Sequence, residues 1–171
     1  MGEHHRGRHD RDFVAWTREQ ADLLRAIPHE TSPLDLGNLV EEIEDMGRSE
    51  IREVSNLLRQ TLLHLLKIAI DPDAPSAMHW FDEVIAFQGD AALVFSPGLA
   101  RRIDLPRIWR VACNGATRSL AKHGISAPPL PRDCPLSLDA LVDPAFDPDA
   151  AVASIATAVD TGDRSKTETP P

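Results

Sequence analysis

Apolar residues recur at steps of three and four along the middle of the chain. They are Leu36, Leu39, Val40, Ile43, Ile51, Val54, Leu57, Leu58, Leu62, Leu65, Leu66 and Ala69. This spacing is that of one face of an α-helix. Ser32 suits the N-cap, Pro33 suits the first position, and Asp35 completes a version of the capping box. We therefore predict one helix over about 33–70, with a kink at Gly47 as the alternative to an unbroken helix.

Shorter helical patterns flank this long helix. Asp12 can cap a first helix, whose apolar stripe is Phe13, Trp16, Leu23, Leu24 and Ile27. Further helical patterns cover about 76–95, 97–103, 105–123 and 138–142. The stretch 126–135 contains four prolines and must be an extended connector. Few windows alternate β-branched or aromatic residues, so we predict an all-α fold, a helical bundle organised around the long helix.

Composition divides the chain into three expected regions. Residues 1–11 are polar and rich in histidine and arginine, so we expect a disordered leader. Residues 12–147 contain the helical patterns and are expected to form a single helical domain. Residues 148–171 carry an alanine-rich patch and then polar residues, so we expect a weakly helical to disordered tail.

The net charge of the 171-residue chain is −9, and its bases are not clustered. This disfavours nucleic acid as a partner. There is no run of about 18 apolar residues that could span a membrane, so we expect no membrane partner and a cytoplasmic location. Cys113 and Cys134 are too few for a disulfide framework, and buried or idle thiols are the simplest interpretation. No motif indicates a cofactor.

Acidic residues gather in the first third of the long helix, and basic residues follow them. The order acid before base suits the helix dipole. A charge run on a helix is usually a solvated face. The functional alternative is a surface for a protein partner. Its candidate residues are Glu41, Glu42, Glu44, Asp45 and Arg48.

A second candidate site lies at the turn after the long helix. If the helices on either side pack as an antiparallel hairpin, His64 and Lys67 face the residues His79, Asp82 and Glu83. Two imidazoles and a carboxylate can bind zinc or a similar ion with an open position. His64, His79 and Glu83 are therefore candidate metal ligands. The structural alternative is a histidine and a lysine paired with carboxylates at the edge of the core.

Several strings of the sequence resemble a known family. They are DFVAW at 12–16, QADLLR at 20–25, LVEEIEDMGRSE at 39–50, HLLK at 64–67 and CPLSLDALVD at 134–143. Together they are similar to the bacterial family called domain of unknown function twenty-nine, over roughly residues 10–148. The resemblance implies a small, all-helical bacterial protein and supplies no reaction, cofactor or catalytic residue. After Trp80 this chain has Phe81, Asp82 and Glu83, where the family tends to place a tryptophan, threonine and arginine series.

The sequence contains no nucleophile elbow, no phosphate-binding glycine loop and no cysteine with an evident base partner. These observations favour a protein without catalytic activity, a protein-interaction or adaptor module that binds a protein partner or self-associates. The alternative is a metal-binding protein or metal-dependent enzyme that uses His64, His79 and Glu83. A small toxin-neutralising or regulatory protein is a third hypothesis.

Overall fold

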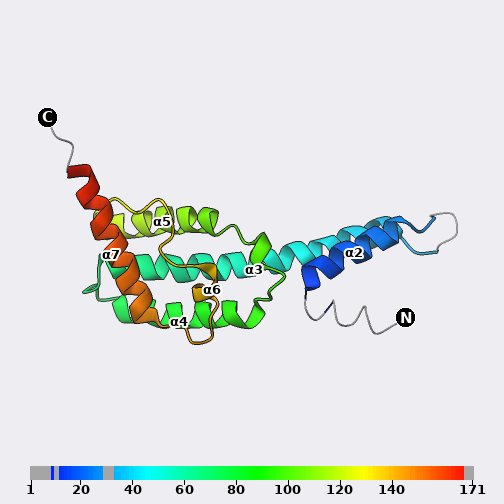
Figure 1. The fold of residues 1–171 in the computed structure, drawn as a ribbon, viewed down its shortest axis with the longest axis horizontal. Helices are drawn as coiled ribbons and strands as arrows, with labels where there is room; N and C mark the ends of the chain where they lie inside the picture. The colour runs from blue at the N-terminus through cyan, green and yellow to red at the C-terminus, as the bar shows by residue number, and fades with distance from the viewer. Residues whose placement is uncertain (1–8, 10–11, 29–32, 168–171) are drawn as a thin grey trace. The chain divides into compact units, whose positions relative to one another are not determined.

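The computed structural model describes residue 9 and residues 12–28 and 33–167, with side chains described as far as residue 161. Every regular element in these ranges is helical, which confirms the predicted all-α fold (Figure 1). In chain order the elements are α2 (Phe13–Arg25), α3 (Leu36–Ile70), α4 (Ala77–Val94), the 3₁₀ turn η2 (Ala100–Arg102), α5 (Leu105–Ala121), α6 (Leu138–Leu141) and α7 (Pro148–Thr167).

Helix α3 begins at Leu36, three residues later than the sequence pattern predicted. The carboxylate of Asp35 accepts a hydrogen bond from the backbone N–H of Asn38 at 3.2 Å, so Asp35 caps the helix. Aspartate and serine are about equally good caps, and the later residue takes this role. The predicted cap Ser32 lies outside the described residues. Helix α3 continues through Gly47 as one element.

The chain forms two compact units, and the first comprises residues 1–54 and 94–103. In this unit α2 packs on the first part of α3 through small side chains, Val14, Thr17 and Ala21. The predicted apolar stripe of α2 was wrong, because Leu23 is 52% exposed and Ile27 is 38% exposed. Small residues at steps of three and four let the two helices approach closely at Gly47, and this selects the buried face of α2.

The second unit comprises residues 55–93 and 104–171. Here the rest of α3 lies between α4 and α5 (Figure 1). The largest fully buried side chains of this unit come from all of its helices, and they are Leu58, Leu62, Leu65, Leu66, Val84, Trp109, Leu120, Leu141 and Ile155. Helix α5 approaches α3 closely at Gly115, where an added Cβ would lie 2.8 Å from Cδ1 of Leu63. The leucine face predicted for the second half of α3 is therefore a core face.

Two side-chain to backbone hydrogen bonds hold irregular segments of the second unit. The Nε2 atom of Gln88 on α4 donates to the carbonyl of Leu141 at 3.3 Å and to that of Asp143 at 2.9 Å. The Nε1 atom of Trp109 on α5 donates to the carbonyl of Pro131 at 2.9 Å. These bonds replace the regular helical hydrogen bonds that the connector and the end of α6 lack.

The region after residue 147 is more regular than the sequence suggested. Helix α7 runs from Pro148 to Thr167 and buries Ala151, Ile155 and Val159, which share one helix face. The prediction of a single domain over 12–147 stays a prediction. The expected disordered leader lies outside the described residues except at residue 9, and so does the end of the tail from residue 168. No helix of the described part is long and apolar enough to cross a membrane.

Candidate functional site

The turn after α3 brings together the histidine cluster that the sequence predicted. At the end of α3 the backbone N–H of Asp71 donates to the carbonyl of Lys67. At the start of α4 the N–H of Ala77 donates to the carbonyl of Ala74. With α4 packed beside α3, Nε2 of His64 lies 3.1 Å from Oε2 of Glu83. The predicted contact between these two helices is therefore present.

His64 and Lys67 are both buried, each 8% exposed. The ring of His64 stacks on Phe87 with centroids 6.0 Å apart, and Nζ of Lys67 lies 4.0 Å from the centroid of the Trp80 ring. Burial lowers the pKa of His64, although the nearby Glu83 carboxylate opposes this. Burial also lowers the pKa of Lys67. The low local dielectric disfavours both charged forms.

The same geometry argues against a metal centre at this cluster. Nε2 of His79 lies 3.6 Å from Oε1 of Glu83, so each imidazole faces a different carboxylate oxygen. Within the described residues no group of three or more His, Cys, Asp or Glu side chains could hold a metal ion. The arrangement fits the structural alternative, a pair at the edge of the core.

Asp82, which the sequence placed in this cluster, lies on the exposed side of α4 instead. It shares that side with Met78, Ile85 and Leu93, which are 75%, 52% and 85% exposed. We call Met78, Asp82, Ile85 and Leu93 the α4 stripe, because their spacing places them on one face of the helix. The sequence pattern does not reveal this surface, because α4 is apolar on nearly all sides and its periodicity does not distinguish the exposed face.

A second exposed stripe runs along α5. Arg107, Val111 and Arg118 lie on one face of this helix, and all three are exposed, Val111 by 46%. We call these residues the α5 stripe. Helix α5 contains three arginines and no acid, whereas α4 contains Asp82, Glu83 and Asp90 and neither lysine nor arginine. The two stripes therefore differ in charge.

The acidic cluster of α3, predicted as an interaction surface, lies in the first unit. Two of its acids are paired within the chain. Arg25 of α2 contacts Glu44 at 2.6 Å, and Arg48 contacts Asp45 at 2.7 Å and Glu44 at 3.5 Å. The hydrogen bond from Arg25 lowers the pKa of Glu44. Glu41 and Glu42 are exposed. The role of this cluster as a partner surface stays a prediction.

The fold and these side-chain clusters define a small all-helical protein with a buried histidine paired to a half-buried glutamate. A family model described as "Domain of unknown function DUF29" matches residues 9–147, and the chain belongs to this family. This confirms the resemblance seen in the sequence.

One solved structure offers a further comparison, an α-helical protein of unknown function from Rhodospirillum rubrum. It is 35% identical to this chain and superposes with a TM-score of 0.77. The match covers 85% of this chain and 95% of the other protein's chain. No curated protein matches the chain. The comparisons thus support the family and the helical fold, and they assign no activity.

Proposed function

We propose that the protein is a self-associating interaction module, in which the α4 stripe of one copy packs on the α5 stripe of the next. The observation that carries the proposal is the exposure of Met78, Ile85 and Leu93 along one face of α4. Single exposed apolar residues are normal on a protein surface. Three on one face of a helix that is apolar on nearly all sides form a surface suited to a partner.

Charge favours a second copy of the chain as that partner. Asp82 lies among the apolar residues of the α4 stripe, and a partner surface that covers it should supply a base. The α5 stripe supplies Arg107 and Arg118 around the exposed Val111. Opposite charges on two surfaces fix the register of a contact and suppress wrong partners.

The placement of the two stripes supports a particular kind of assembly. Helix α3 lies between α4 and α5, so the outer faces of α4 and α5 point in different directions (Figure 1). A contact between two different surfaces is heterologous, and it produces a closed ring or an open chain of copies. We therefore propose an assembly that grows with concentration and does not stop at a symmetric pair.

Size-exclusion chromatography with light scattering tests this proposal over a wide range of protein concentration. The expected result is a mass that increases with concentration and decreases at high salt, because salt screens the charged part of the contact. A mass equal to one chain at every concentration and at low salt would contradict the proposal.

Charge reversal makes the test specific. Asp82→Arg and Arg118→Asp should each weaken self-association. An equimolar mixture of the two variants should recover it, because each altered stripe then finds a complementary one. Arg110→Asp is the matched control, since Arg110 lies on α5 outside the α5 stripe. Failure of the mixture to associate, with the wild-type protein associating, would place the contact elsewhere on the chain.

We keep the role expected from the sequence, that of an interaction module without catalytic activity in the cytoplasm. The bridging geometry of Glu83 gives no support to the metal-dependent alternative. The exposed acids Glu41 and Glu42 remain candidates for a separate protein partner, to be tested by charge reversal in the same way.

A further inference from the structure

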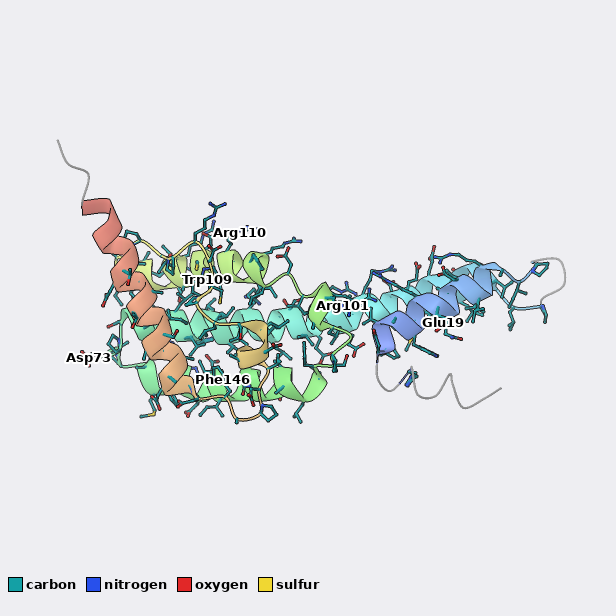
Figure 2. All side chains as sticks on the ribbon, viewed as in Figure 1. Glu19, Asp73, Arg101, Trp109, Arg110 and Phe146 are labelled. Atoms are coloured by element: carbon teal, nitrogen blue, oxygen red, sulfur yellow. The ribbon has the colours of Figure 1, made fainter. Side chains whose placement is uncertain are left out.

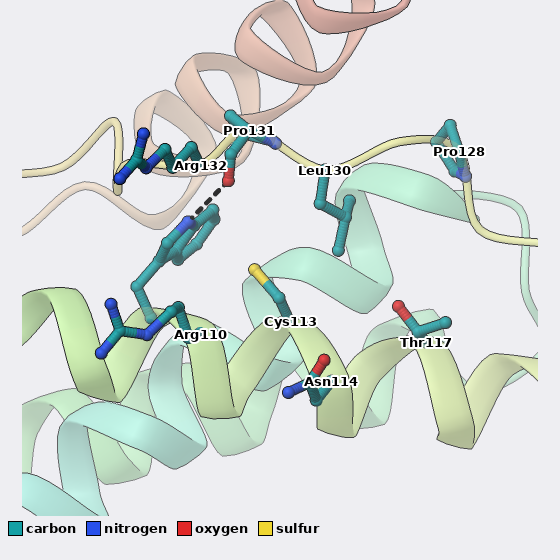
Figure 3. A pocket seen from close by; sticks show the side chains of 9 residues that line it. Arg110, Cys113, Asn114, Thr117, Pro128, Leu130, Pro131 and Arg132 are labelled. Atoms are coloured by element: carbon teal, nitrogen blue, oxygen red, sulfur yellow. Dashed lines mark hydrogen bonds between the residues drawn. The ribbon is translucent and has the colours of Figure 1, made fainter.

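An open surface cavity of about 400 Å³ lies between α5 and the connector that follows it. Trp109, Arg110 and Cys113 line it from α5, and Leu130 and Arg132 line it from the connector (Figure 3). The volume is within the range of pockets that hold small organic ligands. Trp109 and Cys113 lie on a different side of the helix from the α5 stripe, and Arg110 lies beside it on the exposed surface of α5.

The walls of this cavity are held in place by the protein itself. The buried indole of Trp109 donates its Nε1–H to the carbonyl of Pro131 at 2.9 Å, which ties the connector to α5 (Figure 3). Pro128 and Pro131 restrict the backbone of the connector, because the proline ring fixes φ. A preformed pocket binds a ligand with little further loss of conformational freedom.

Two guanidinium groups give the cavity a positive end. Figure 3 shows Arg110 and Arg132 at the same end of the cavity, and Figure 2 shows Arg110 next to Trp109 on α5. No acidic side chain is among the described residues that line the cavity. Neither arginine forms an ion pair with a described residue. A guanidinium is a planar cation with several N–H donors, so these two side chains offer charge and hydrogen bonds to an anion.

The rest of the cavity is apolar or neutral. Leu130 and Pro128 supply accessible apolar surface, and Asn114 and Thr117 supply neutral hydrogen-bonding groups farther along α5. Burial raises the pKa of Cys113 to about 12, so its thiol is neutral near pH 7 and does not repel an anion. A neutral thiol is also a poor nucleophile, and this argues for binding over covalent chemistry.

We propose that this cavity binds a small organic anion, a carboxylate carried on a flat apolar body. The carboxylate lies between Arg110 and Arg132, because guanidinium and carboxylate groups form paired, charge-assisted hydrogen bonds. The apolar body lies against Leu130 and Pro128 of the connector. This proposal does not depend on the self-association proposed above.

Calorimetric titration of the full chain with benzoate and 2-naphthoate tests the proposal. We expect saturable binding of at least one of these probes, and binding of the neutral 2-naphthamide weaker by about tenfold or more, since it lacks the charge that the arginines recognise. In NMR spectra the indole N–H signal of Trp109 should shift with the probe, while that of Trp16, which lies in the first unit, should not. No saturable binding of either carboxylate overturns the proposal.

Single substitutions assign the binding to the cavity. Arg110→Gln and Arg132→Gln should each weaken 2-naphthoate binding by about tenfold or more. Arg118→Gln is the matched control, because it removes the same charge from α5 outside the cavity, and it should leave the affinity unchanged. Both cavity arginines are exposed, so their variants should fold, and circular dichroism checks this. Equal affinity in all three variants and the wild type would show that the anion binds elsewhere, and it would overturn the proposal.

Discussion

Gly47 lies directly beneath the side chain of Thr17. A Cβ atom added at Gly47 would collide with Oγ1 of Thr17 and lie 3.5 Å from its Cβ. Thr17 is 1% exposed, and its hydroxyl donates to the carbonyl of Val14 at 3.0 Å. The side chain therefore has little freedom to move away, and α2 can pack on α3 at this point only because residue 47 has no side chain.

Gly47→Ala should consequently destabilise the protein by about 1–3 kcal/mol, the usual cost of overpacking a tight site. This change is opposite in sign to the gain in stability of roughly 1 kcal/mol that is expected when alanine replaces glycine at a solvent-exposed position inside a helix. Urea unfolding measures the difference. Gly37→Ala is the control, because its Cβ would meet only Asp35 Oδ1 at an ordinary 3.7 Å. Adding Thr17→Ala to Gly47→Ala should recover part of the loss, and strictly additive effects would contradict this explanation.

The buried His64 makes stability depend on pH. Burial holds the pKa of His64 below its ordinary value of 6.5, so the unfolded chain binds a proton more readily than the folded chain. The free energy of unfolding should therefore decrease as the pH falls from 6.5 toward the lowered pKa, and this contribution is fully present above pH 6.5. His64→Gln, which cannot titrate, should flatten this part of the profile measured by urea unfolding.

His79→Gln is the control for this pH experiment. It removes an imidazole from the same cluster, but the His79 side chain is 70% exposed. A profile for His64→Gln that follows the wild type across the same interval would contradict the assignment of the pH dependence to His64.

Gln88 should be the main tether of the segment after α6. Gln88→Ala removes the donor to the carbonyls of Leu141 and Asp143, and should cost about 1–3 kcal/mol because the buried Leu141 carbonyl loses this partner, whereas that of Asp143 keeps the N–H of Phe146. Hydrogen exchange measured by mass spectrometry should become faster in peptides that cover 138–147. Peptides from α5 serve as the internal control, and uniform acceleration in both would indicate a global effect.

The two thiols should be unreactive in the folded protein. Burial raises the pKa of Cys113 to about 12 and also raises the pKa of Cys134. Since the thiolate is the reactive form, a disulfide reagent at pH 8 should modify neither cysteine until urea unfolds the chain. The variant Cys134→Ser isolates Cys113 in this assay. Rapid reaction of the folded variant would show that Cys113 is not protected.

The features that the sequence predicted well depend on local periodicity. The leucine face of α3 and the cap at Asp12 follow from residue spacing and side-chain chemistry alone, and the structure contains both, with Asp12 Oδ1 accepting from the N–H of Ala15 at 2.8 Å. The contact between His64 and Glu83 could be predicted with one further assumption. This assumption is that the short turn after α3 joins α3 and α4 as an antiparallel hairpin.

The features that the sequence did not predict depend on tertiary packing. The buried face of α2 is chosen by the fit of small residues against Gly47, which outweighs the larger apolar residues Leu23 and Ile27. The sequence does not show which face of α4 is exposed, because the helix is apolar on nearly all sides. The cavity exists because a proline-rich connector returns to α5 and is held at Pro131, a contact across 22 residues of sequence.

The position of Lys67 over the ring of Trp80 has a practical consequence. A cation 4.0 Å from the ring centroid alters the electrostatic environment of the indole, so the fluorescence of Trp80, read apart from that of Trp16 and Trp109, should change when the α3–α4 hairpin opens. This tryptophan is thus an intrinsic optical reporter, one that needs no label and responds when the two helices separate.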